Sequence, residues 1–176
     1  MLVSHRQSCR RTIVILSVLL LVSCTAPSAP HEQARSNYEK DVENELRALM
    51  QEYFATWNQV TCENWEPILR FYDYNSGSGF ISGRETTVMR YSGDAWPKWI
   101  AEGACSRTRE EGVIDSLIVR VLSPDIATVS LTYHGTYYEP AGPRQAQGTL
   151  LQVFTRTSSG WKTPVEMSTH LPLAPK

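Results

Sequence analysis

The sequence of 176 residues has no run of Lys and Arg, no internal repeat and no low-complexity block. The absence of a basic patch argues against nucleic acid as a partner. Its glycines follow no phosphate-loop pattern, and no serine stands in a nucleophile motif. No group of His, Cys and acidic residues has metal-ligand spacing. We therefore expect neither a metal nor another cofactor.

A long apolar run is also lacking. The uncharged stretch over residues 12–22 is too short for a transmembrane helix, which needs roughly 20 apolar residues. Arg6, Arg10 and Arg11 precede the stretch, and Leu21-Val22-Ser23-Cys24 closes it. A positive segment followed by a short apolar segment is typical of a secretory signal peptide.

The tetrapeptide that ends at Cys24 resembles the lipobox of bacterial lipoprotein signal peptides. The resemblance implies that residues 1–23 are removed and that acyl chains on Cys24 anchor the protein to a membrane. Thr25 is not the Asp that marks inner-membrane retention in that class. For a source with an outer membrane, the resemblance therefore favours delivery to that membrane, facing the periplasm. The alternatives are an ordinary signal cleaved within residues 25–29 and an uncleaved anchor.

Removal of residues 1–23 would leave about 150 residues, the size of one ordinary domain. Cys62 and Cys105 then remain as an even pair in an exported domain, where disulfides persist. Such a bond would close a loop of about 43 residues and contribute roughly 4 kcal/mol in the chain-entropy model. Two free cysteines are the alternative.

The folded domain is expected over residues 38–176, because residues 24–37 are small, polar and rich in proline, as in a flexible tether. Apolar residues recur at three- and four-residue steps and predict a helix from about Tyr38 to Trp57. A short second helix should begin near Asn64 as its N-cap. More helix is expected from residue 84 to 104, interrupted near residues 92–93, with Asp94 capping the last piece.

From there the apolar period changes to two, which indicates strands. The sequence predicts a short strand over residues 80–82 and longer ones over 113–122, 126–134, 147–156 and 161–171. Pro164 cannot donate to a ladder, so the last strand should carry a bulge or face solvent there. Helices first and an antiparallel meander second indicate an α+β fold.

Several segments, in this order and spacing, resemble the SnoaL-like branch of the nuclear-transport-factor-2-like superfamily: Phe71-Tyr72-Asp73, residues 122–129, residues 149–156, Ser159-Gly160-Trp161-Lys162 and Ser168-Thr169-His170. The resemblance implies a cone-like curved antiparallel β-sheet wrapped around about three N-terminal helices. A pocket should lie at the open end of the cone.

A steroid isomerase of this superfamily works with a carboxylate base, a tyrosine and a protonated acid. Tyr53 matches the tyrosine, but Phe80 stands where the base is expected and Gln152 near the second acid. We therefore expect no evident catalysis, with Tyr53 and His170 as the remaining catalytic candidates. Other polar residues have ordinary explanations: exposure for His134 and Glu166, and a helix end or turn for Asp73.

The ligand-binding candidates are aromatic or polar residues of the helices and strands that would face the cone interior: Tyr53, Trp57, Trp99, Tyr133, Gln152 and His170. The leading interpretation is a lipid-anchored periplasmic domain that binds a small apolar molecule or serves as an accessory protein. One alternative is an isomerase- or cyclase-type enzyme. Another is an envelope-protein assembly module that forms a homodimer through its sheet.

Overall fold

The computed structural model describes the backbone of residues 30–74, 79–84 and 87–173, and the side chains of residues 37–74, 93–171 and 173. The predicted signal peptide and the predicted lipidation site, Cys24, lie outside these residues. Helix α1 (Pro30–Trp57) begins earlier than predicted, so residues 30–37, expected in the tether, are helical. A helix tolerates proline at its first position, where the missing N–H would have no partner.

The short elements after α1 differ in part from expectation. A 3₁₀ helix, η1 (Glu66–Phe71), follows Trp65 as its N-cap, so the prediction of Asn64 was wrong. Strands β1 (Gly79–Arg84) and β2 (Thr87–Ser92) form an antiparallel hairpin, and the helix predicted over the latter was also wrong. β-branched Thr87 and Val88 favour a strand once a partner strand is present.

Helix α2 (Ala95–Cys105) begins after Asp94, as predicted, although the Asp94 side chain makes no capping hydrogen bond. Cys105 at its end is joined by a disulfide to Cys62 in the loop between α1 and η1. The bond therefore ties the end of α2 to the segment that follows α1. No described helix has both the length and the apolar character needed to cross a membrane.

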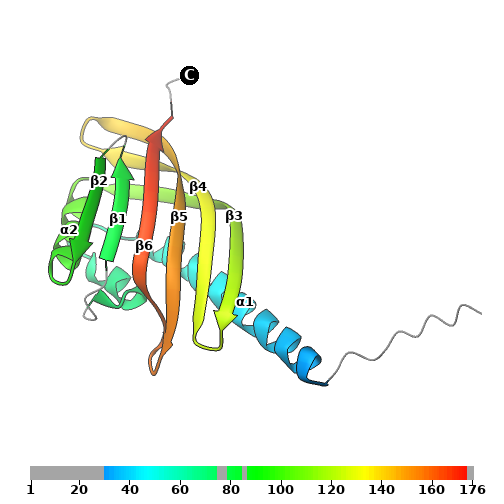
Figure 1. The fold of residues 1–176 in the computed structure, drawn as a ribbon. Coiled ribbons are helices and arrows are strands. Elements are labelled where there is room, and N and C mark those ends of the chain that lie inside the picture. Colours follow the sequence, from blue (N-terminus) through cyan, green and yellow to red (C-terminus); the bar gives the residue numbers. More distant parts are fainter. Residues whose placement is uncertain (1–29, 75–78, 85–86, 174–176) are drawn as a thin grey trace, which may run out of the picture.

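Four long strands complete the sheet: β3 (Arg109–Ser123), β4 (Ile126–Glu139), β5 (Gly142–Thr157) and β6 (Gly160–Pro172). The strand order is β2-β1-β6-β5-β4-β3, and every pair is antiparallel except β1–β6, which is parallel. The curved sheet lies against the helices (Figure 1). The predicted α+β cone is therefore confirmed, with one parallel pair that was not expected.

The bulge predicted at Pro164 is present. Thr163 and Pro164 together oppose Phe154 of β5, so the ladder carries one extra residue in β6. The Thr163 hydroxyl donates to the Val153 carbonyl at 3.0 Å. This side-chain hydrogen bond joins β6 to the β5 backbone at the bulge, where the regular ladder of backbone hydrogen bonds is interrupted.

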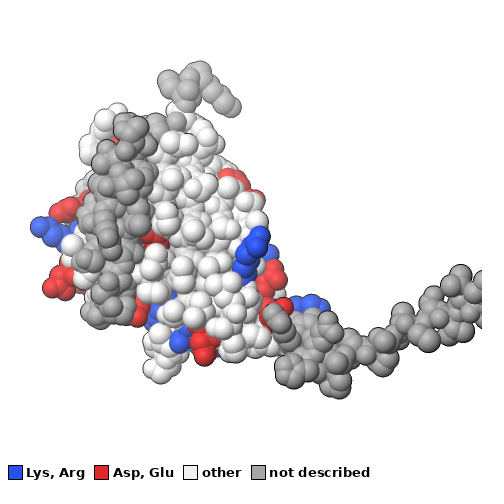
Figure 2. All heavy atoms as spheres, in the orientation of Figure 1, with Lys and Arg blue, Asp and Glu red and all other residues white. Residues whose placement is uncertain are grey.

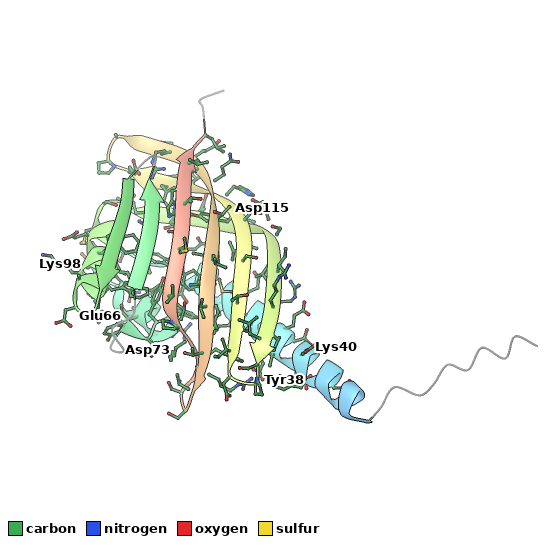
Figure 3. All side chains as sticks on the ribbon, in the orientation of Figure 1. Tyr38, Lys40, Glu66, Asp73, Lys98 and Asp115 are labelled. Atoms are coloured by element: carbon green, nitrogen blue, oxygen red, sulfur yellow. A yellow bond between two sulfur atoms is a disulfide. The ribbon has the colours of Figure 1, made fainter. Side chains whose placement is uncertain are left out.

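The core lies between α1 and the inner face of the sheet. Val42, Leu46, Met50 and Tyr53 recur along one side of α1 and are buried. Nearer the start of the helix, the Tyr38 hydroxyl donates to the Ser123 carbonyl at the end of β3, and Figure 3 shows Tyr38 beside this end of the sheet. Helix α1 is thereby held along β3.

Candidate functional site

A pocket of about 210 Å³ lies between the C-terminal half of α1, helix α2 and the inner faces of β3 to β6. Its walls are largely aromatic, contributed by Tyr53, Phe54, Trp57, Trp99, Tyr133 and Tyr137. The polar lining residues come mainly from the strands. A mostly aromatic cavity with a few convergent polar groups is typical of a site for a small organic molecule.

Five of the six predicted ligand-binding residues line this pocket: Tyr53, Trp57, Trp99, Tyr133 and His170. Gln152 does not line it. Its side chain is completely buried behind the pocket, where the amide nitrogen donates to the Glu166 carboxyl at 2.6 Å. Gln152 thus acts on the site through Glu166.

Glu166 is the most important of the lining residues that sequence reasoning missed, which also include Arg107, Glu110 and Ser168. It is 4% exposed and lines the pocket, so the expectation that it faces solvent was wrong. Its neighbours Val165 and Met167 are the exposed ones, at 38% and 46%. Alternation along a strand separates two faces but does not say which is inside. A signal was present, because His170 was expected in the pocket wall and residues two and four positions earlier share its face.

Three side chains from different elements hold the Glu166 carboxyl. Its Oε2 atom accepts hydrogen bonds from Gln152 at 2.6 Å, from the Tyr72 hydroxyl at 3.0 Å and from the Tyr53 hydroxyl at 3.3 Å. The two tyrosine oxygens lie 2.7 Å apart. These donors favour the charged form, but burial outweighs them and raises the pKa of Glu166 to about 7. The carboxyl can therefore hold or release a proton near neutral pH.

The second catalytic candidate, His170, belongs to a separate hydrogen-bonded group. Its Nδ1 atom lies 2.7 Å from the Tyr133 hydroxyl and 3.3 Å from that of Tyr137. Tyr53 and His170 both line the pocket but belong to different hydrogen-bonded groups, because the Tyr53 hydroxyl bonds Tyr72 and Glu166. Burial raises the pKa of Tyr133 far above its usual value, so this hydroxyl keeps its proton at every physiological pH.

A glycine makes the contact between Tyr133 and His170 feasible. Gly148 of β5 is paired with both residues, on β4 and β6 respectively. A Cβ atom at Gly148 would lie 2.6 Å from the Tyr133 hydroxyl oxygen and 2.1 Å from the Thr169 carbonyl oxygen. The bare backbone therefore allows the Tyr133 ring to cross β5 and reach β6.

Two Arg–Glu ion pairs also line the pocket. Arg107 forms an ion pair with Glu110, with Nη2 and Oε2 2.6 Å apart, and both side chains are only 12% exposed. Arg144 bonds Glu139 at 2.7 Å nearer the surface. Both guanidinium groups also lie over the Tyr137 ring, at 5.5 and 4.8 Å from its centroid. Burial raises the pKa of Glu110, and the charge of Arg107 opposes that rise.

The remaining predicted residues lie apart from the pocket or outside the described side chains. His134 is exposed on the outer face, as expected, and pairs with Asp115 at 2.6 Å. Asp73 is half-buried just after η1. The Phe80 side chain lies outside the described residues, but its backbone is in register with Glu166 on the neighbouring strand. Within the described part of the chain, no three His, Cys or acidic residues gather as a metal site would need.

The fold is shared with proteins of known structure. No family model matches the sequence, and no curated protein matches it. A Novosphingobium aromaticivorans protein with a provisional scytalone dehydratase assignment matches 80% of this chain and 93% of its own, at 11% identity and a TM-score of 0.64. A superfamily member from Salmonella enterica serovar Typhimurium, of the nuclear-transport-factor-2-like class, matches 78% and 94%, at 12% identity and a TM-score of 0.59.

A third solved structure, from Xanthomonas campestris, carries a provisional assignment as a calcium/calmodulin-dependent protein kinase II association domain. It matches 74% of this chain and 88% of its own, at 18% identity and a TM-score of 0.59. Identities this low establish the fold alone. The chain therefore has the cone fold of the nuclear-transport-factor-2-like proteins, and its function has to be argued from the site.

Proposed function

We propose that this domain binds a small, mostly apolar molecule in the pocket and that Glu166 is the acid–base group of the site. The observation that carries the proposal is a buried carboxyl at the pocket wall, with a pKa of about 7, held by Tyr53, Tyr72 and Gln152. A group that titrates at the working pH can both donate and accept a proton. Perturbed carboxyls in pockets are typical of functional sites.

The same carboxyl supports an enzyme as the more specific form of this function. The expectation of no evident catalysis depended on Phe80 at the base position, whereas Glu166 brings a carboxyl to the pocket from the adjacent strand. Isomerases and dehydratases need one group that moves a proton within a water-poor site. The neighbour with a provisional scytalone dehydratase assignment is in keeping with such chemistry.

Binding can be tested through the tryptophans. Trp57 and Trp99 line the pocket, whereas the Trp161 indole bonds Glu45 elsewhere. In a titration with small ring compounds followed by NMR of the indole N–H signals, Trp57 and Trp99 should shift and Trp161 should not. Equal shifts of all three indoles, or none for any compound, would contradict the proposal. A ¹³C titration of the Glu166 carboxyl should give a midpoint near pH 7.

We also propose that acyl chains on Cys24 anchor this domain in the cell envelope, on the strength of the lipobox-like Leu21-Val22-Ser23-Cys24. One chain gives only marginal membrane binding, whereas two or more give stable attachment. The variant Cys24→Ser should move the protein from the membrane fraction to the soluble fraction. Unchanged membrane retention of the variant would count against lipidation.

The outer face of the sheet supports a second function, assembly into a homodimer. Its exposed apolar residues are spread over four strands: Val113, Ile118, Leu122, Ile126, Leu151, Val165, Met167 and Leu171. Figure 2 shows that the described residues at the centre of this face are uncharged. Exposed apolar patches of this kind are typical of protein interfaces. One structural neighbour is described as an association domain, which also favours assembly.

Met167→Glu would place a charge in the middle of this outer face. It should lower self-association measured by sedimentation while leaving the fold intact. Ser159→Glu, in the exposed turn between β5 and β6, is the matched control and should leave self-association unchanged. A wild-type protein that stays monomeric at high concentration would remove this second function.

A further inference from the structure

We infer that Ser168 and Glu166 together bind a single hydroxyl group of a neutral, one-ring ligand. The inference rests on the proposed binding function and adds to it a second binding residue and a ligand class. It depends on an unpartnered hydroxyl, on the geometry of the Glu166 carboxyl and on the pairing of the surrounding charges.

Ser168 carries a buried hydroxyl for which the described residues supply no partner. The residue is 6% exposed and lines the pocket, and among the described residues no group forms a hydrogen bond with its Oγ atom. Buried hydroxyls nearly always have a partner, because an unsatisfied one costs about 1–3 kcal/mol. A ligand oxygen in the pocket would supply the missing bond.

One of the two carboxyl oxygens of Glu166 accepts hydrogen bonds from described residues, and the other does not. The donors Tyr53, Tyr72 and Gln152 all bond Oε2, and no described residue donates to Oε1. Tyr72 and Gln152 do not line the pocket, whereas Glu166 does. Oε1 is therefore the oxygen left for a ligand, and it is the atom on which the proton of the neutral acid would reside.

The two groups lie side by side on β6. Residues 166 and 168 are two apart in a strand and both face inward, which places them next to each other on one face. A hydroxyl has one donor and two acceptor sites. It can donate to the Glu166 carboxylate and accept from Ser168, or accept from the protonated acid. A carbonyl oxygen could accept from Ser168 at either pH, but from Glu166 only when that acid is protonated.

The size and charge of the pocket indicate the rest of the ligand. A cavity of about 150 Å³ holds benzene, so about 210 Å³ suits one ring with a short substituent. The lining cations Arg107 and Arg144 are already paired with Glu110 and Glu139. An anionic ligand would have to break one of those pairs, which disfavours it.

Groups that face Glu166 keep their charge state between pH 6 and 8. They are Tyr53 from α1, Tyr72 after η1, Gln152 from β5 and, farther away, Tyr133 from β4. Burial keeps the tyrosines protonated, and Gln152 does not titrate. On the same strand, His170 bonds Tyr133 and lies four residues along. His170 also lines the pocket, and a histidine side chain ordinarily titrates in this pH range. Each pH comparison is therefore repeated in Glu166→Gln, in which only the titration of Glu166 is lost.

The test compares four one-ring probes on the purified protein: phenol, toluene, benzoate and benzylamine, each titrated at pH 6 and pH 8. Affinity is read from the indole signals of Trp57 and Trp99. Phenol should bind best at both pH values, about tenfold more tightly than toluene, which corresponds to one good hydrogen bond. Ser168→Ala should weaken the affinity for phenol by about fivefold to tenfold. It should leave the affinity for toluene within about twofold of the wild-type value, which would show that the pocket is intact.

Thr169→Ala removes the next hydroxyl along β6, which faces outward, and should leave both affinities unchanged. Three results would overturn the inference while leaving a binding pocket: toluene binding as tightly as phenol, equal losses for both probes in Ser168→Ala, or benzylamine binding best and more tightly at pH 8. The absence of any indole shift with all four probes would contradict both this inference and the proposed binding function.

Discussion

Strands β4 and β6 lie in the same sheet and distribute their polar residues in opposite ways. In β4, Ala127, Val129 and Leu131 face the core and are buried, while the alternate positions, 128, 130 and 132, are Thr and Ser. In β6 the inward residues are Glu166 and Ser168, and Met167 between them is exposed. This segment of β4 lies in the hydrophobic core, whereas the segment of β6 around Glu166 and Ser168 borders the pocket.

The difference teaches that burial in this protein is decided by what lies opposite a strand. Glu166 is tolerated inside because Gln152, Tyr72 and Tyr53 bond one of its oxygens. A buried carboxyl without such partners would be much more costly. Met167 lies on the outer face among other exposed apolar residues, such as Val165 and Leu151.

The largest expected effect is on stability, when a side chain is shortened on the inner or on the outer face of β5. Phe154 is 1% exposed on the inner face of β5, whereas Leu151 is exposed on the outer face. Phe154→Ala should lower the free energy of unfolding by about 3–5 kcal/mol because it leaves a cavity. Leu151→Ala should cost less than about 1 kcal/mol. Urea denaturation measures both, and equal losses would contradict the assignment of the faces.

The buried acid of β6 should make stability depend on pH. The folded-state pKa of Glu166 is raised to about 7 from 4.5. Between these values the unfolded chain releases the proton while the folded one retains it, so the free energy of unfolding should fall as pH rises. The contribution is about 3 kcal/mol, fully lost above pH 7.

Glu166→Gln serves as the comparison protein, because its amide does not titrate. The wild-type protein should lose stability relative to this variant from about pH 4.5 to pH 7.5, as measured by denaturation at a series of pH values. Parallel stability curves for the two proteins would show that the folded-state pKa of Glu166 is not raised.

The smallest of these effects concerns Gly148, which leaves room for the Tyr133 ring to cross β5 and reach His170. Gly148→Ala should destabilise by about 1–3 kcal/mol, since the added methyl group would clash with the Thr169 carbonyl and the Tyr133 hydroxyl. It should also shift the NMR signals of His170. Gly103→Ala, where the nearest atom would be 3.7 Å away, is the control. A Gly148→Ala protein as stable as this control would argue against the close crossing of Tyr133.

Sequence reasoning was most reliable where local pattern and packing agree. The turn and the alternation around residues 123–134 predicted β4, and Pro164 predicted the bulge because it has no N–H to donate. It was wrong at β2, because a strand of six residues depends on its partner β1 for its hydrogen bonds. The pocket aromatics could be proposed in advance, but the hydrogen bonds that join Glu166 to Tyr72 span 94 positions.

By itself the sequence determined the kinds of element and their order, since helix and strand periods, prolines and turn residues act over a few neighbouring positions. It also determined that β6 has one polar and one apolar face. Only the tertiary structure decided which of these faces is inside. That choice depends on α1, η1 and β5 meeting at Glu166, where their hydrogen bonds offset part of the cost of removing a carboxyl from water.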